Sequence, residues 1–166
     1  MDCVVLAMKF NKRTYKNLRE LFSDLLFPIK NRKRLREVRN KGLLSPPFQE
    51  RLMLAVTSVE GCRYCSYFHS KLALKSGVSQ EEIVKLLSGE VEDCPEEEAL
   101  AVLYAQHWAE SNACPGKEAA ERLEETYGQE KAEAIDLMLR MIRLGNLLGN
   151  TWDYLLYRIS FGKWRR

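Results

Sequence analysis

Apolar residues recur along this chain at helical spacing, and no segment alternates apolar and polar residues as a half-buried strand does. In the first apolar segment, Tyr15–Phe27, the pattern predicts a helix with one apolar side, made of Leu18, Leu21, Phe22, Leu25 and Leu26. Pro28 should end this helix, because proline has no N–H to donate and its ring clashes with the preceding turn. The basic segment that follows predicts a second, mostly polar helix up to Lys41.

Capping residues mark the next two helices. Ser45 can cap a helix that has two prolines in its first turn, where missing N–H groups matter little, and that runs to about Val59. Gly61 breaks the chain, and the helix after it carries two cysteines and runs to about Ser76. Gly77 suits the left-handed conformation in which many helices end. These two helices should form an antiparallel hairpin around Gly61.

The rest of the chain also predicts helices. A short helix should run from the capping box Ser79–Glu82 to near Gly89, and the next from Pro95 to about Ser111. Another should run from Pro115 to near Gly128. The last should cover Gln129–Phe161, with interruptions at Gly145 and Gly149. The sequence therefore predicts an all-α fold, a single-domain helical bundle over residues 1–166 with a central antiparallel helix hairpin.

Composition and length fit one ordinary globular domain. The 166 residues are 46% hydrophobic, which is enough for one core. No apolar run approaches the roughly 18 residues that a membrane span needs, and the apolar stretch Cys3–Met8 is too short for a signal peptide. We therefore expect no membrane partner and a cytoplasmic location.

Charge is distributed unevenly along the chain. Residues 1–60 carry 13 lysines and arginines against six acidic residues, whereas residues 61–166 carry 13 against 17. Seven of the basic residues lie within Lys30–Lys41. Such a cluster could attract nucleic acid, but no aromatic residues interleave it and no nucleic-acid motif surrounds it. A solvated or subunit-facing helix side is the favoured interpretation, and a nucleic-acid partner is disfavoured.

Three chemically reactive residues fall within two helical turns, in the segment Cys62-Arg-Tyr-Cys65-Ser-Tyr-Phe-His69. Positions i, i+3 and i+7 lie on one face of a helix, so both sulfurs and the imidazole can meet. The chain has five cysteines at irregular spacing, which does not indicate a secreted disulfide framework. Cys94 and Cys114 each precede a proline at an expected helix start, and they are assigned structural roles. A close cysteine pair in a reducing compartment is typical of redox, catalytic or metal-binding sites.

Glu50 extends this site across the hairpin. With a rise of about 1.5 Å per residue, Glu50 lies about 16 Å from the turn on one helix, and His69 lies about 12 Å from it on the other. If Glu50 faces inward, the order Glu50, His69, Cys65, Cys62 follows. A carboxylate in this order orients an imidazole, the imidazole deprotonates a thiol, and the thiolate attacks a peroxide or a disulfide. Cys65 is nearer the base and is favoured as the attacking thiol, with Cys62 as the resolving thiol, although the helix N-terminus also favours a thiolate at Cys62.

The four-residue pattern of the hairpin resembles the active-site motif of alkylhydroperoxidase D-like proteins in the carboxymuconolactone decarboxylase superfamily. It consists of Glu50, eleven intervening residues, Cys62-x-x-Cys65, three more residues and His69. Such spacing is much more specific than a lone Cys-x-x-Cys. The resemblance is clearest over residues 45–89, which are the core motif region of the expected domain.

The resemblance implies an all-helical homo-oligomer, a trimer or hexamer, with a two-cysteine site that reduces hydroperoxides or disulfides in an antioxidant role. The substrate would be a small hydroperoxide or disulfide, the reductant an unidentified protein thiol, and no cofactor is expected. Tyr64 is similar to the peroxidase-related branch, whereas the best-known alkylhydroperoxidases have histidine there. A phenol with a pKa near 10 is a poor base, so Tyr64 is a possible relay residue only through water. The decarboxylases of the superfamily act without a cysteine pair, which favours redox chemistry here.

Two other classes of function remain open from the sequence. The two cysteines and His69 could bind zinc with Glu50 as a fourth ligand, although one short helix rarely presents a full tetrahedral set. The chain could also be a non-enzymatic redox-sensing oligomer whose basic helix over Lys30–Lys41 binds an acidic partner. Covalent haem attachment is excluded, because it needs a histidine where Ser66 stands.

Overall fold

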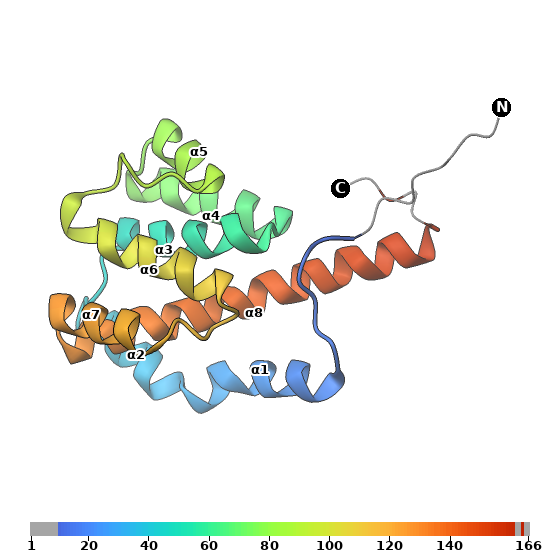
Figure 1. Ribbon diagram of the computed structural model, residues 1–166, viewed down its shortest axis with the longest axis horizontal. Coiled ribbons are helices and arrows are strands. Elements are labelled where there is room, and N and C mark those ends of the chain that lie inside the picture. Colours follow the sequence, from blue (N-terminus) through green and yellow to red (C-terminus); the bar gives the residue numbers. More distant parts are fainter. Residues whose placement is uncertain (1–9, 162–163, 165–166) are drawn as a thin grey trace.

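The computed structural model describes residues 10–161 and Trp164, and these residues form a bundle of helices joined by short loops (Figure 1). The helices are α1 (Leu18–Lys30), α2 (Arg32–Asn40), α3 (Pro46–Glu60), α4 (Arg63–Ser76), α5 (Gln80–Ser88), α6 (Glu96–Glu110), α7 (Lys117–Tyr127) and α8 (Gln129–Ile159). The described residues contain no β-strand, and the predicted all-α class is confirmed. The apolar segment that begins at Cys3 lies outside the described residues.

Helix α3 is the centre of the bundle, and α4, α5, α6 and α8 pack around it. Its buried side chains include Phe48, Leu52, Leu54 and Val56, none of which is more than 2% exposed. Trp108 of α6 is the largest buried side chain of the same core. Burial of each such side chain contributes about 1.5–3 kcal/mol, so α3 is a firm base for the side chains that it positions.

The caps expected around the hairpin are present. Ser45 accepts a hydrogen bond from the backbone N–H of Phe48 at 3.3 Å. Gly61 and Gly77 end α3 and α4 with φ angles of 68° and 97°. A residue with a β-carbon would be strained at both angles, which explains why glycine stands there.

The expected capping box of α5 forms only in part. Ser79 accepts a hydrogen bond from the backbone N–H of Glu82 at 3.1 Å, but the Glu82 carboxylate binds Arg51 of α3 at 2.5 Å. The same guanidinium binds Glu98 of α6 at 2.9 Å. Arg51 therefore joins three helices through a largely buried ion cluster, and its loss would leave two carboxylates without the cation that they share.

The expected boundaries of the first helix are wrong. Helix α1 begins at Leu18, after Asn17 accepts a hydrogen bond from the N–H of Glu20 at 2.9 Å, and it continues through Pro28 to Lys30. Pro28 stands in the last turn, so the helix loses one hydrogen bond shortly before it ends. Pro28 lies two residues before the end of α1, so it does not set where the helix stops.

The expected interruptions of the last helix are also wrong, because α8 continues through Gly145 and Gly149 to Ile159. A glycine inside a helix costs only about 1 kcal/mol relative to alanine, which packing can outweigh. Both glycines face α4, and the C-terminal part of α8 extends beyond the other helices (Figure 1). None of the helices in the described part of the chain is long and apolar enough to cross a membrane.

The basic helix α2 lies against the first turns of α8. Arg34 pairs with Glu133 at 2.7 Å, and Lys41 pairs with Glu130 at 2.5 Å. Part of the basic cluster is thus neutralised by acidic residues of the same chain. Exposed pairs of this kind contribute at most about 1 kcal/mol, so they add little to the stability of the bundle.

Candidate redox site

The site lies where α4 begins, against α8. Cys62 is the N-cap of α4, and its sulfur accepts a hydrogen bond from the backbone N–H of Cys65 at 3.4 Å. The side chain of Cys62 is fully buried. The first N–H groups of a helix have no partner within the helix, so a sulfur at the N-cap receives them and is stabilised as a thiolate.

The surroundings of Cys62 lower its pKa to about 6. The largest cause is a hydrogen bond from the thiol of Cys65. The backbone N–H groups of Cys65 and Tyr64 and the charge of Lys12 act in the same direction, whereas burial opposes them because it disfavours the charged form. At neutral pH the sulfur of Cys62 is therefore mainly a thiolate.

Cys65 is in the opposite state. Its pKa is raised, first because its proton is held in the hydrogen bond to Cys62, and further by burial and by the negative charge on Cys62. Proximity to the base favoured Cys65 as the attacking thiol, whereas the N-terminus of α4 favoured a thiolate at Cys62; the lowered pKa of Cys62, caused first by the hydrogen bond from Cys65 and then by backbone N–H groups, agrees with the second argument. Cys65 is nevertheless the sulfur that borders a cavity, and its role as the attacking thiol stays a prediction.

Glu50 and His69 meet across the hairpin. Nδ1 of His69 lies 2.8 Å from Oε2 of Glu50, and both side chains are 14% exposed. An ionised carboxylate can only accept hydrogen bonds, so Nδ1 carries the proton and the lone pair is on Nε2. A carboxylate in this position prepares an imidazole to take a proton from a thiol.

A cavity of about 410 Å³ opens beside Cys65 and His69. Its remaining walls are mainly apolar and consist of Met53, Tyr64, Phe68, Met141, Ile142 and Gly145. The cavity thus brings one thiol and the imidazole to a common surface, while Cys62 and Glu50 do not border it. Walls of this kind favour an organic molecule that has few charges.

Tyr64 is tied to α8. Its hydroxyl donates to Oδ1 of Asp153 at 2.9 Å and accepts from Arg63 at 2.9 Å, so a relay through Tyr64 stays a prediction. Asp153, which sequence reasoning did not single out, is 2% exposed and also binds Arg63 at 2.8 Å and Lys12 at 3.8 Å. The available signal was a lone acidic residue in the largely apolar segment Trp152–Ile159.

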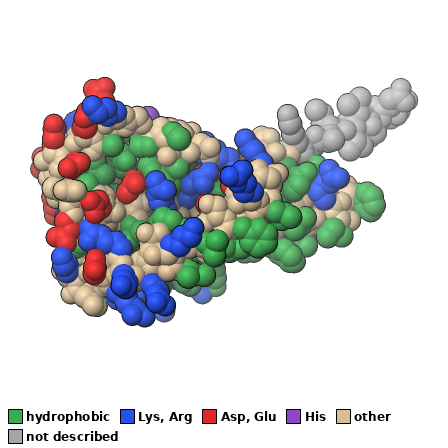
Figure 2. Space-filling view, turned by 90° about the horizontal axis from the view of Figure 1, so that it is seen from below, with side chains coloured by type: hydrophobic (Ala, Val, Ile, Leu, Met, Phe, Trp, Pro, Cys, Tyr) green, Lys and Arg blue, Asp and Glu red, His purple; other side chains and the backbone are tan. Residues whose placement is uncertain are grey.

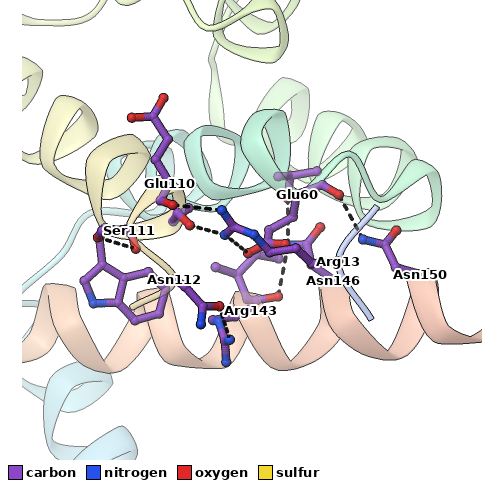
Figure 3. Close-up of polar contacts among 12 residues, drawn as sticks. Arg13, Glu60, Glu110, Ser111, Asn112, Arg143, Asn146 and Asn150 are labelled. Carbon is purple, nitrogen blue, oxygen red and sulfur yellow. Dashed lines mark hydrogen bonds and ion pairs between the residues drawn. The ribbon is translucent and has the colours of Figure 1, made fainter. Parts of the chain in front are cut away.

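A buried polar cluster holds the end of α3, next to the site (Figure 3). Arg13, from the segment before α1, lies 3.2 Å from Oε1 of Glu60 and donates to carbonyl oxygens at the end of α6. Asn150 of α8 donates to the carbonyl oxygen of Glu60 at 2.9 Å. Burial raises the pKa of Glu60, and the charge of Arg13 acts against that rise. Because Glu60 stands two residues before Cys62, these contacts also fix the start of α4.

The residues suggested as zinc ligands do not converge. Glu50 reaches the site only through Nδ1 of His69. Among the described residues, no group of three His, Cys, Asp or Glu side chains is arranged to hold a metal ion.

Comparison with known families identifies the central part of the chain. Residues 31–107 match the model of the Carboxymuconolactone decarboxylase family. No curated protein and no solved structure matches the chain. The matched range runs from α2 into α6 and contains the whole hairpin with its glutamate, cysteine pair and histidine. Over this range, which is a little under half of the chain, the protein is similar to the carboxymuconolactone decarboxylase family, of the alkylhydroperoxidase D-like superfamily.

Proposed function

We propose that this protein is a two-cysteine thiol oxidoreductase that reduces organic hydroperoxides, with disulfides as a second class of substrate. One observation supports the proposal: the sulfur of Cys62 caps α4 with a lowered pKa, a hydrogen bond joins it to the thiol of Cys65, and Cys65 borders the cavity beside His69. A thiolate is the attacking species in both reactions. The apolar cavity walls support an organic hydroperoxide as the preferred substrate.

The first step uses the proton of Cys65. Its transfer to Nε2 of His69 makes Cys65 a thiolate at the cavity wall. This thiolate attacks the distal peroxide oxygen, the O–O bond breaks, and Cys65 becomes a sulfenic acid. The departing alkoxide takes a proton from the imidazolium of His69 and leaves as an alcohol. The peroxide gains two electrons, and the sulfur loses two.

Cys62 then resolves the sulfenic acid. Its thiolate attacks the sulfur of Cys65, an S–S bond forms, and the hydroxide that leaves is protonated to water. Starting from the pair with one proton, one hydroperoxide and one further proton give one alcohol, one water and one disulfide. A dithiol protein must then return the pair to its reduced state by thiol–disulfide exchange.

Stopped-flow mixing of the reduced protein with cumene hydroperoxide tests this proposal. We expect two thiols to be lost per chain, much faster than a free thiol reacts, and mass spectrometry to locate a Cys62–Cys65 disulfide. Cys65→Ser should abolish the reaction, and Cys62→Ser should stop it at the sulfenic acid. Cys114→Ser is the matched control, because Cys114 is an exposed cysteine outside the site and its loss should leave the rate unchanged.

The same experiment can refute the thiol mechanism. If Cys62→Ser and Cys65→Ser both keep the full rate, neither sulfur takes part in the reaction. If the unmodified protein reacts no faster than a free thiol, hydroperoxide reduction is refuted. Reduction of a model disulfide by the reduced protein would then decide whether the pair acts in disulfide exchange.

We also propose that the protein is a homo-oligomer of three or six chains. Large apolar side chains are exposed on α1 and on the C-terminal part of α8, including Leu18, Phe22, Ile29, Trp152 and Ile159, each between 56% and 73% exposed. Figure 2 shows hydrophobic side chains gathered toward the end of the molecule from which α8 projects. Contiguous apolar surface of this kind is typical of protein interfaces. Light scattering should give the mass of three or six chains, and a monomer would contradict the proposal.

A further inference from the structure

Two glycines of α8 face the sulfur atoms of the cysteine pair. A β-carbon placed on Gly149 would lie 2.6 Å from Sγ of Cys62 and 3.2 Å from the ring of Tyr64. A β-carbon placed on Gly145, one turn earlier, would lie 3.7 Å from Sγ of Cys65, which is an ordinary van der Waals distance. The backbone of α8 therefore meets Cys62 at a point where no side chain fits.

The contact at Gly149 leaves the sulfur of Cys62 little freedom. The side chain is short and fully buried, and the N–H of Cys65 holds the sulfur from the other side at 3.4 Å. A methyl group at position 149 must therefore push the sulfur out of the N-cap position, or push the first turn of α4 away from α8. Either movement breaks the N–H contact and the alignment of the two sulfurs.

We propose that Gly149 is a positioning residue of the redox pair, because its missing side chain seats the Cys62 sulfur on the first turn of α4, beside Cys65. The geometry stands on its own, while the consequence for turnover rests on the thiol chemistry proposed above. Gly145 offers a matched comparison. Both glycines are interior positions of α8, so alanine brings a similar gain in helix propensity at each, and the contact with sulfur differs.

The groups around the sulfur of Cys62 determine how far its pKa changes when the sulfur is displaced. Cys65 and Tyr64 face it from α4 and Lys12 faces it from the segment before α1, while Asp153 of α8 binds both Tyr64 and Lys12. A displaced sulfur loses the hydrogen bonds that lower its pKa to about 6. If its pKa returns to the ordinary value near 8.5, the fraction ionised at pH 7 falls about 30-fold.

Titration of the thiolate absorbance near 240 nm tests the role of Gly149. In Gly149→Ala the low-pH step should move to the range of an ordinary thiol, with about a 30-fold loss of thiolate at pH 7. In Gly145→Ala the step should stay where it is in the unmodified protein. An unmoved step in a folded Gly149→Ala chain, or equal shifts in both variants, would overturn the proposal. The titration needs no substrate, so its result is independent of whether the protein reduces hydroperoxides.

A double variant decides the case in which Gly149→Ala does not fold. Cys62→Ala removes the sulfur that the new methyl group meets at 2.6 Å. Cys62→Ala/Gly149→Ala should therefore fold, with a urea midpoint close to that of Cys62→Ala alone. If the double variant also fails to fold while Cys62→Ala folds, the intolerance at position 149 has another cause and the proposal is wrong.

Discussion

The cysteine pair should make the stability of the reduced protein rise with pH, and Cys62→Ser should remove that rise. The pKa of Cys62 is about 6 in the folded chain, whereas thiols titrate near 8.5 in an unfolded chain. Between these two pH values the folded chain holds fewer protons than the unfolded chain. Stability rises with pH wherever the unfolded state binds more protons, so this contribution grows from pH 6 upward and is lost as the pH falls through 6.

The size of the effect depends on both sulfurs. Cys65 stays protonated in the folded chain because its pKa is raised, whereas both thiols can ionise once the chain unfolds. With one folded pKa of about 6 and two unfolded values near 8.5, linkage adds about 1 kcal/mol of stability at pH 7 relative to pH 5. By the same reasoning, the free energy of unfolding at pH 8.5 exceeds that at pH 5 by roughly 2–3 kcal/mol. Above that pH the second thiol of the unfolded chain ionises, and the gain declines.

Urea unfolding of the unmodified protein and of Cys62→Ser, both kept reduced, measures this effect at pH 5, 7 and 8.5. Other titratable groups contribute equally to the stability of both proteins, so their contributions cancel when the two proteins are compared at each pH. The advantage of the unmodified protein should grow by roughly 2–3 kcal/mol from pH 5 to pH 8.5, while Cys114→Ser should show no such growth. A difference between the two proteins that stays constant with pH would refute a thiolate at Cys62.

Three further variants test other parts of the site. Glu50→Gln keeps the side-chain shape but removes the charge that fixes the imidazole, so stopped flow should show hydroperoxide reduction slowed about 10–100-fold with an unchanged urea midpoint. Lys12→Met removes a positive charge near Cys62, so the thiolate titration should move to higher pH, and more so at low ionic strength. Arg13→Met removes the cation bound to Glu60 and leaves only the weaker effect of Arg143 on this buried carboxylate. Because Arg13 is 38% exposed, we expect a loss near the low end for buried pairs, roughly 3 kcal/mol at pH 7. Urea unfolding should show a loss that becomes smaller as the pH is lowered, because the raised pKa of Glu60 lets the carboxyl take up a proton at a higher pH than an ordinary glutamate does. A Glu50→Gln rate equal to that of the unmodified protein would contradict the first expectation. A thiolate titration unmoved by Lys12→Met would contradict the second, and a stability loss in Arg13→Met that does not change with pH would contradict the third.

Local signals in the sequence predicted most of the helices and identified the reactive side chains of the site. Ser45 and Gly77 mark helix ends through their own hydrogen bonds and backbone angles, which depend on a few neighbouring residues. The meeting of Glu50 with His69 is also accessible from the sequence, because both positions are counted from the same turn along helices of constant rise. These features need no knowledge of how the other helices pack.

The state of the two sulfurs could not be predicted in the same way. Distance along α4 favoured Cys65 as the attacking thiol, because it stands closer to the imidazole, while the N-terminus of α4 favoured a thiolate at Cys62. The charge on Cys62 depends instead on a hydrogen bond from Cys65, on N–H groups at the start of α4, and on Lys12 from a segment far away in sequence. Packing brings Lys12 there, and no periodicity in the sequence records it.

The segment Gly145–Asn150 of α8 links the unbroken helix to the chemistry of the site. Asn150 donates to the carbonyl oxygen of Glu60 and so holds the end of α3, while its neighbour Gly149 gives space to the sulfur of Cys62. A hydrogen bond to sulfur weakens steeply with distance and angle, so a thiolate at an N-cap needs fixed backbone on both sides. A break in α8 at these glycines would change the position of Asn150, which holds the end of α3, relative to Gly149, which leaves space for the sulfur of Cys62. Packing of this turn against α3 and α4 outweighs the cost of about 1 kcal/mol for a glycine inside a helix, so α8 continues where glycine alone would predict an interruption.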